Sequence, residues 1–163
     1  MFLQETFVVW DTLFYDDGIS GTASYSTGSA VTKEIGDEYT TFSTLTSNST
    51  TGRITSTTSF TGDIECLLQC NITYESQVGV YVGFRSSNPT SWRINVTDWR
   101  YIKFRRVNGV YSAQISTDGV NWSDMTPYDN NAGSGAVTFY LLIYNPTGVK
   151  KTFDFKELLI YSV

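Results

Sequence analysis

The stretch from Arg100 to Trp122, RYIKFRRVNGVYSAQISTDGVNW, limits the possible folds of this chain more than any other segment. In its first half Ile102 and Phe104 alternate with polar and charged residues, so one face of an extended segment is apolar and the other is charged. Asn108-Gly109 is the signature of a type I′ hairpin turn, because both central residues of that turn need φ > 0. The alternation resumes after the turn. The sequence therefore predicts an antiparallel meander with one buried face.

Similar alternation recurs along most of the chain, with turn signals between the segments and no convincing helical period. The further strands that it predicts are Thr6–Tyr15, Thr40–Thr46, Arg53–Phe60, Asp63–Ile72, Gln77–Arg85, Ser91–Val96, Ala136–Tyr144 and Lys150–Ser162. We expect loops over 16–37 and 124–135, and a turn at Asn88-Pro89. About ten short strands at this spacing predict an all-β, two-sheet antiparallel sandwich or jelly roll.

Length and composition limit the setting and the partners. A chain of 163 residues is expected to form a single domain, 1–163, which buries roughly 70% of the surface of the unfolded chain. Only 17% of the residues are charged, and Thr, Ser and Gly are abundant, as on extracellular or virion surfaces. The net charge of −5 argues against nucleic acid as a partner. The sequence has no apolar run of membrane-spanning length, so we expect no membrane insertion.

The N-terminal segment, residues 1–13, is predicted to be a first strand or a docking arm. It has no basic n-region and no small-residue cleavage site, so it does not match a secretory signal.

The two cysteines lie four residues apart in one predicted strand. Their Cα atoms would be about 13 Å apart at the usual rise of a strand. A disulfide needs a Cα–Cα distance of about 4.4–6.8 Å, so Cys66 and Cys70 cannot bond to each other there. They share a face with Ile64, Leu68 and Ile72, which predicts buried free thiols.

Together these segments resemble the concanavalin A-like lectin and glucanase jelly roll. The resemblance runs from about Phe14 to Val163 and is carried by GDIECLLQCNI followed by VGVYVGFR, by the YIKFRRVNGVYSAQISTDGVNW meander and by the terminal FDFKELLIYSV. It implies two curved antiparallel sheets, a last strand that returns beside the first, and a concave face that binds glycans in many members. The activity of this member does not follow from the fold.

Catalysis is not expected. Glucanases of this family carry alternate carboxylates, E-x-D-x-E, on one strand, and retaining hydrolysis needs two carboxylates about 5–5.5 Å apart. Asp63 and Glu65 share a face, but Leu67 takes the third position, so we interpret Glu65 as a solvent-facing residue. The chain has no histidine to act as the base in other hydrolytic chemistries.

We expect no cofactor, although calcium remains an alternative. Asp16-Asp17-Gly18 and Tyr128-Asp129-Asn130-Asn131 are clusters of the oxygen ligands that Ca²⁺ prefers. Asp and Asn are also common turn formers, and this is the interpretation that we favour.

Candidate glycan-binding residues lie on the strand faces opposite the core, where aromatic rings can stack on sugars and polar groups can bind hydroxyls. The predicted site consists of Tyr81, Arg85, Tyr140, Tyr144 and Gln69. Ordinary cross-strand pairing of Tyr with Arg is the alternative explanation.

The leading hypothesis is a non-catalytic recognition module on a virion fibre or a cell surface, which binds a cell-surface glycan or glycoprotein for receptor binding or adhesion. The alternative is a structural domain for capsid decoration or assembly, with a homo-oligomer formed through a fibre. A glycoside hydrolase is the third candidate, and the missing acidic strand argues against it.

Overall fold

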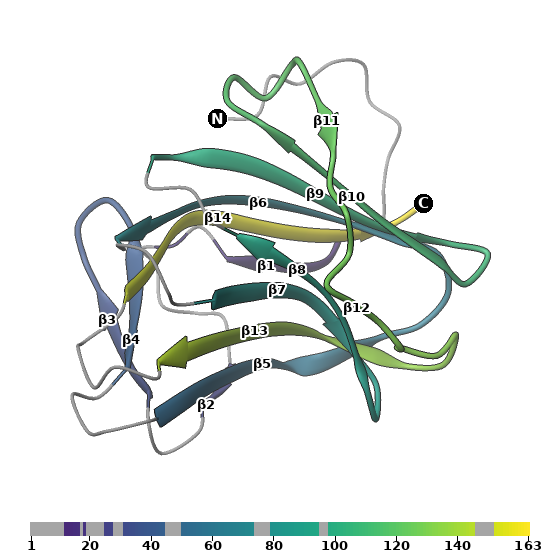
Figure 1. Cartoon of the computed structure of the whole chain (residues 1–163), viewed down its shortest axis with the longest axis horizontal. Coiled ribbons are helices and arrows are strands. Elements are labelled where there is room, and N and C mark those ends of the chain that lie inside the picture. The colour runs from purple at the N-terminus through teal and green to yellow at the C-terminus, as the bar shows by residue number, and fades with distance from the viewer. Residues whose placement is uncertain are drawn as a thin grey trace.

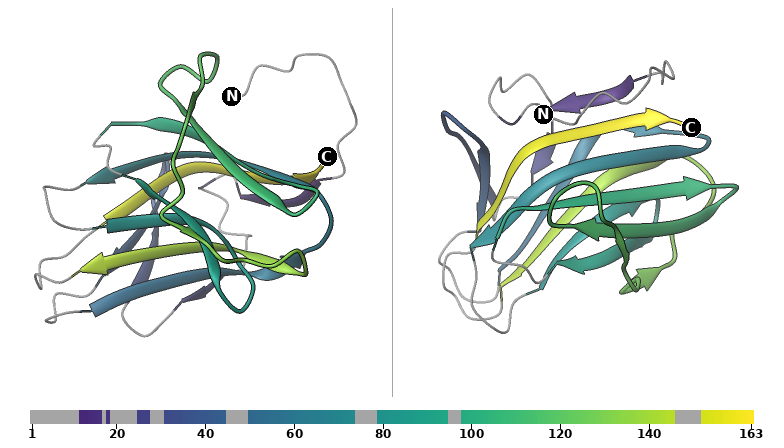
Figure 2. Two further views of the ribbon diagram at one scale, coloured as in Figure 1. Left: turned by 45° about the vertical axis from the view of Figure 1, so that its right-hand side comes forward. Right: turned by 90° about the horizontal axis from the view of Figure 1, so that it is seen from above.

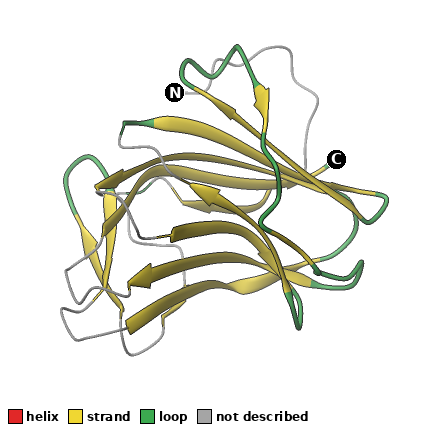
Figure 3. Ribbon diagram, viewed as in Figure 1, coloured by secondary structure: helices red, strands yellow, loops and turns green. Residues whose placement is uncertain are grey.

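The computed structural model describes residues 12–16, 18, 25–27, 31–44, 50–73, 79–94, 98–145 and 152–163. Within these ranges the chain forms strands and turns only, as Figure 3 shows, so they hold no helix long and apolar enough to cross a membrane. The all-β prediction is confirmed.

The strands form two antiparallel sheets that pack face to face (Figure 1). The eight-stranded sheet contains β1 (Thr12–Asp16), β3 (Val31–Ile35), β4 (Thr40–Thr44), β6 (Ile64–Thr73), β9 (Arg100–Val107), β10 (Val110–Ser116), β11 (Ser123–Asp124) and β14 (Thr152–Ser162). Its order is β11-β10-β9-β6-β14-β4-β3, and β1 also pairs with β14. The expected return of the last strand beside the first is therefore confirmed.

The six-stranded sheet contains β2 (Tyr25–Thr27), β5 (Thr50–Phe60), β7 (Gly79–Arg85), β8 (Pro89–Ile94), β12 (Asp129–Asn130) and β13 (Val137–Asn145). Its order is β12-β8-β7-β13-β5-β2. Figure 2 shows the two layers from two further directions. Each sheet has an inner face on the core and an outer face on the opposite side.

The core lies between the sheets, where alternate side chains of each strand meet. Trp92 on β8 packs against Phe104 on β9 with ring centroids 5.4 Å apart, and Phe84 on β7 contacts the same ring at 6.4 Å. All three are fully buried. Each such burial contributes about 1.5–3 kcal/mol, which makes this contact between the sheets a major part of the stability.

The turn and cysteine predictions are also confirmed. Asn108 and Gly109 both have positive φ, at 51° and 76°, as a type I′ turn between β9 and β10 requires. Cys66 and Cys70 are free and fully buried on the inner face of β6. Burial raises the pKa of both thiols, because the charged thiolate is poorly solvated in the core.

One buried charge closes the end of the sandwich, at the position that continues the inner face of Ile102 and Phe104 along β9. Arg106 on β9 is 1% exposed, and its guanidinium donates hydrogen bonds to the carbonyl oxygens of Gly62 and Gly135, each at 2.8 Å. The side chain also reaches the Phe60 carbonyl. It therefore ties β9 to the β5–β6 turn and to the segment before β13.

Two of the predicted loops contain strands. Segment 16–37 includes β2 and β3, and segment 124–135 includes β12 and the end of β11. Pro89, expected in a turn, begins β8. These strands escaped prediction because most are only two to five residues long, too short for a clear alternation, and pairing with a neighbour defines them. The predicted N-terminal arm and the first part of the predicted first strand, residues 1–11, lie outside the described residues.

Candidate functional site

Four of the five predicted site residues lie on one face. Tyr81 and Arg85 project from β7, and Tyr140 and Tyr144 project from β13, which pairs directly with β7. The register sets Leu142 opposite Tyr81 and Thr138 opposite Arg85, so these side chains share the outer face of the six-stranded sheet. The inner-facing residues of the same strands, such as Val82 and Leu141, are fully buried.

Gln69 is separated from the other four. It lies on β6 in the eight-stranded sheet, where it pairs with Tyr101 on β9 and Glu157 on β14. The structure therefore excludes Gln69 from a site shared with the tyrosines. Alternation in a sequence tells which residues of one strand share a face, but it does not tell which strands share a sheet.

Tyr140 is covered although it faces outward. Its side chain is 4% exposed, and the guanidinium carbon of Arg85 lies 5.7 Å from its ring centroid. Arg53 on β5 also lies close enough for its charge to act on the Tyr140 hydroxyl. Burial raises the pKa of Tyr140, and the two arginines oppose that shift. The prediction that Tyr140 offers an open ring is thus wrong, and Tyr140 instead supports the arginines around it.

Tyr81 forms a second group of contacts on this face, with Tyr128 and Arg93. Its ring lies 4.6 Å from that of Tyr128, which precedes β12 and is 62% exposed. Burial raises the pKa of Tyr81, and Tyr128 raises it further, while Arg93 on β8 lowers it. The pairing of β12 with β8 brings Tyr128 here from a segment that the sequence predicted to be a loop. Tyr144, at 46% exposed, extends the face along β13.

We call this surface the tyrosine–arginine face. It consists of Arg53, Tyr81, Arg85, Arg93, Tyr128, Tyr140 and Tyr144. Arg53, Arg93 and Tyr128 were not among the predicted site residues. Arg53 and Arg93 alternate with the buried Ile54, Trp92 and Ile94, which was a usable signal, whereas the position of Tyr128 depended on strand pairing.

The carboxylates considered for catalysis lie on or beside the opposite sheet. Asp63 accepts a hydrogen bond from the Asn108 amide at 2.8 Å. Glu65 is 8% exposed, pairs with Arg105 at 2.8 Å and accepts a hydrogen bond from the Tyr161 hydroxyl. The expectation that Glu65 faces solvent is wrong. These contacts hold both side chains in place as parts of the fold.

In the first cluster considered for calcium, Asp17 lies outside the described residues, and Asp16 is bonded within the protein. Asp16 is buried and accepts hydrogen bonds from the Gly18 amide at 2.9 Å and the Tyr25 hydroxyl at 2.8 Å. In the second cluster, Asp129 and Asn130 form β12. The described residues contain no group of three or more His, Cys, Asp or Glu side chains placed to hold a metal ion.

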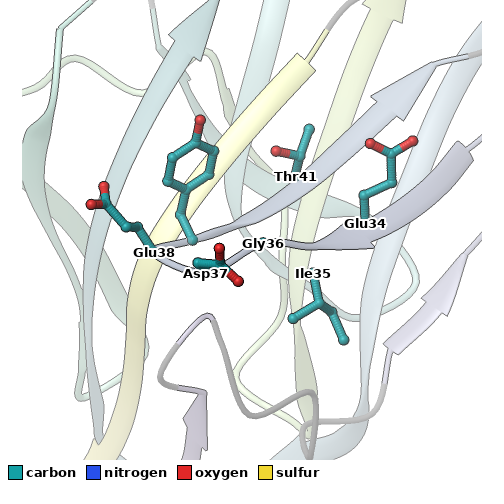
Figure 4. Close-up of a pocket in the computed structure, with 7 residues that line it drawn as sticks. Glu34, Ile35, Gly36, Asp37, Glu38 and Thr41 are labelled. Atoms are coloured by element: carbon teal, nitrogen blue, oxygen red, sulfur yellow. The ribbon is translucent and has the colours of Figure 1, made fainter.

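A shallow depression of about 520 Å³ lies at the β3–β4 hairpin, lined by Glu34, Ile35, Gly36, Asp37, Glu38, Tyr39 and Thr41 (Figure 4). Of its three carboxylates, Glu34 lies on β3 and Asp37 and Glu38 lie in the turn that follows, and Figure 4 shows Glu34 and Glu38 well apart. The depression lies at the edge of the eight-stranded sheet, whereas the tyrosine–arginine face belongs to the six-stranded sheet.

No family model matches the sequence, and no curated protein matches it significantly. Solved structures do match. The carbohydrate recognition domain of Emp47p is 12% identical with a TM-score of 0.59, covering 90% of this chain and 93% of that one. The Ca²⁺-bound exoplasmic/lumenal domain of VIP36 is 8% identical with a TM-score of 0.61, covering 93% and 90%.

A third match comes from work on endo-acting O-glycanases that human gut microbes express to initiate mucin breakdown. It is 7% identical with a TM-score of 0.67, and it covers 94% of this chain and all of that one. Identities this low establish the fold alone. With its two antiparallel sheets and these structural neighbours, the chain has the concanavalin A-like jelly-roll fold that its sequence resembles.

Proposed function

We propose that this chain is a non-catalytic glycan-recognition domain that binds through the tyrosine–arginine face. Its setting is a virion fibre or a cell surface, where the partner is a glycan or glycoprotein of another cell. The low charge and high Thr, Ser and Gly content support that setting.

The observation that carries the proposal is the grouping of exposed rings with polar donors on one sheet. Tyr128 and Tyr144 are exposed, at 62% and 46%, Tyr81 is half-buried beside Tyr128, and arginines lie next to them. Aromatic rings stack on the apolar faces of sugars, and guanidinium groups donate to hydroxyl and carboxyl oxygens. The neighbouring lectin domains support the same kind of ligand, since one VIP36 structure contains Man3GlcNAc.

The distribution of carboxylates supports a role without catalysis. Glycoside hydrolysis in most families needs a pair of carboxyl groups across the scissile bond. In the strands of the six-stranded sheet the one carboxylate is Asp129. Asp63 and Glu65 belong to the other side of the sandwich and are bound by Asn108, Arg105 and Tyr161.

A glycan array probed with the purified chain tests the proposal. We expect binding to a defined subset of glycans, and we expect it to weaken in Tyr81→Ala and in Tyr144→Ala. The matched control is Tyr39→Ala: Tyr39 is an exposed tyrosine on the β3–β4 hairpin that contacts Trp99 with ring centroids 5.5 Å apart. The control should bind as the unmodified chain does.

Four results would contradict the proposal. Equal loss of binding in all three variants, each still folded by circular dichroism, would show that the tyrosine–arginine face is not the specific binding site, and an array with no binding would exclude a glycan ligand. Hydrolysis of a polysaccharide that Glu65→Gln abolishes would establish an enzyme. A stable oligomer in light scattering, together with no binding on the glycan array, would favour a structural domain for capsid decoration or assembly.

A further inference from the structure

We propose that the ligand of the tyrosine–arginine face is an anionic saccharide, whose carboxylate or sulfate group is bound between Arg53 and Arg85 above Tyr140. This inference rests on the proposed function, because it names the ligand class of the same surface.

Charge is distributed unevenly over the two sheets. The chain as a whole has a net charge of −5. The six-stranded sheet departs from this balance, since its strands carry Arg53, Arg85 and Arg93 but only one carboxylate, Asp129. In the strands of the eight-stranded sheet, cationic and anionic residues are equally frequent. An acidic protein that gathers arginines on one face attracts anions there.

Two of these arginines converge on the same phenol. The pairing places Tyr140 between them along β13, because Arg53 lies opposite Leu142 on one side and Arg85 lies opposite Thr138 on the other. The guanidinium of Arg85 lies over the Tyr140 ring, and the charge of Arg53 acts on the Tyr140 hydroxyl. Within the part of the chain that the structure describes, neither guanidinium forms an ion pair. Both positive charges act on Tyr140, and the charge of one carboxylate, Asp129, acts on it as well.

An acidic group of a ligand would be attracted by both guanidinium groups. The planar fork of arginine matches carboxylate and sulfate oxygens bidentately, which a neutral sugar hydroxyl cannot do. Tyr140 is too covered to stack on a sugar, so it acts as the support that holds the two guanidinium groups toward solvent. The exposed rings of Tyr128 and Tyr144 then remain to contact the sugar rings that flank the acidic group.

The test compares glycans that differ only in their acidic group. Calorimetric titration would use lactose, sialyllactose and sulfated lactose, with the unmodified chain and with Arg53→Gln, Arg85→Gln and Arg85→Lys. Arg100→Gln is the matched control, because Arg100 lies on the other sheet, where its guanidinium forms a long ion pair with Asp98, at 3.7 Å, and donates a hydrogen bond to the carbonyl oxygen of its neighbour Trp99, at 2.9 Å. Circular dichroism would confirm that each variant is folded.

We expect an acidic glycan to bind at least about tenfold more tightly than lactose, as charge-assisted hydrogen bonds of this kind provide. Arg53→Gln and Arg85→Gln should remove the preference for the acidic glycan. Arg85→Lys should keep part of that preference, and Arg100→Gln should leave it unchanged. A preference for sialyllactose identifies a carboxylate, and one for sulfated lactose identifies a sulfate.

The outcomes separate this inference from the proposed function. If neutral glycans bind tightly and both glutamine variants retain that binding, the inference of an anionic ligand would be wrong. The proposed glycan-recognition function would still hold. No binding to any glycan would overturn both. Binding of a short DNA duplex as tight as that of sialyllactose would show that the face responds to charge alone, and this would also overturn both.

Discussion

The ring of Tyr81 lies across Gly79, two residues earlier on the same face of β7. A Cβ placed on Gly79 would lie 2.2 Å from Cε2 of Tyr81 and 2.4 Å from its hydroxyl oxygen. The absence of a side chain at position 79 therefore sets the position of the Tyr81 ring, and through it the contact with Tyr128.

Gly79→Ala should displace the Tyr81 ring while the fold persists, because the clash is with the end of a flexible side chain. The raised pKa of Tyr81 depends on burial and on Tyr128, so we expect that pKa to fall toward its ordinary value. Titration of labelled tyrosine by NMR would measure it. Gly133→Ala is the control, since a Cβ there meets nothing within 4 Å. An unchanged Tyr81 pKa would contradict the prediction.

Arg106→Met should destabilise the protein strongly. The substitution keeps an apolar stem but leaves the carbonyl oxygens of Gly62 and Gly135 without their donor in a buried site. We expect a loss of about 3 kcal/mol in the free energy of unfolding, as for other buried polar groups that lose a charged partner. Urea denaturation would measure it. Arg100→Met, which removes an ion pair at the surface, should cost less than about 1 kcal/mol.

Gly18→Ala should be more damaging than Gly62→Ala, although both glycines have positive φ, at 74° and 73°. A Cβ on Gly18 would lie 2.6 Å from the carbonyl oxygen of Lys156 on β14, and backbone cannot move aside as a side chain can. At Gly62 a Cβ meets nothing within 4 Å. We expect about 1 kcal/mol for the backbone strain at Gly62 and clearly more at Gly18. Equal thermal melting temperatures would contradict this.

Stability should fall in alkaline solution. Burial raises the pKa of Cys66, Cys70, Tyr25 and Tyr161 above their ordinary values of 9.0 and 10.0, and nearby carboxylates also raise it for Cys66 and both tyrosines. The folded state therefore holds these protons more tightly than the unfolded chain. This stabilises the fold fully below the unfolded pKa values, and the contribution is lost as the pH rises through them toward the folded values.

Each such group can contribute up to about 1.4 kcal/mol per pH unit to the decline. Urea denaturation between about pH 8 and 11 would measure it, with the first loss near the ordinary thiol pKa. A variant with Cys66→Ala and Cys70→Ala should show a shallower slope in the lower part of this range. A free energy of unfolding that stays constant over the range would contradict the prediction.

The sequence by itself determined the inner face of each long strand. Ile64, Cys66 and Leu68 on β6 and Val80, Val82 and Phe84 on β7 are buried as their alternation predicts. The reason is local: successive side chains of an extended chain point to opposite sides, so spacing alone tells which residues meet the core. The Asn108-Gly109 turn could also be predicted from the sequence, because its backbone conformation depends on those two residues alone.

Tertiary structure decided which of these faces share a surface. Gln69 and Tyr81 have the same kind of outward position, yet strand order places them on opposite sheets. Arg53, Arg93 and Tyr128 join the tyrosine–arginine face because β5, β8 and β12 assemble around β7 and β13. Whether Tyr140 is open or covered depends on side chains from two neighbouring strands. Contacts between residues distant in sequence determine such features, and no pattern within one strand encodes them.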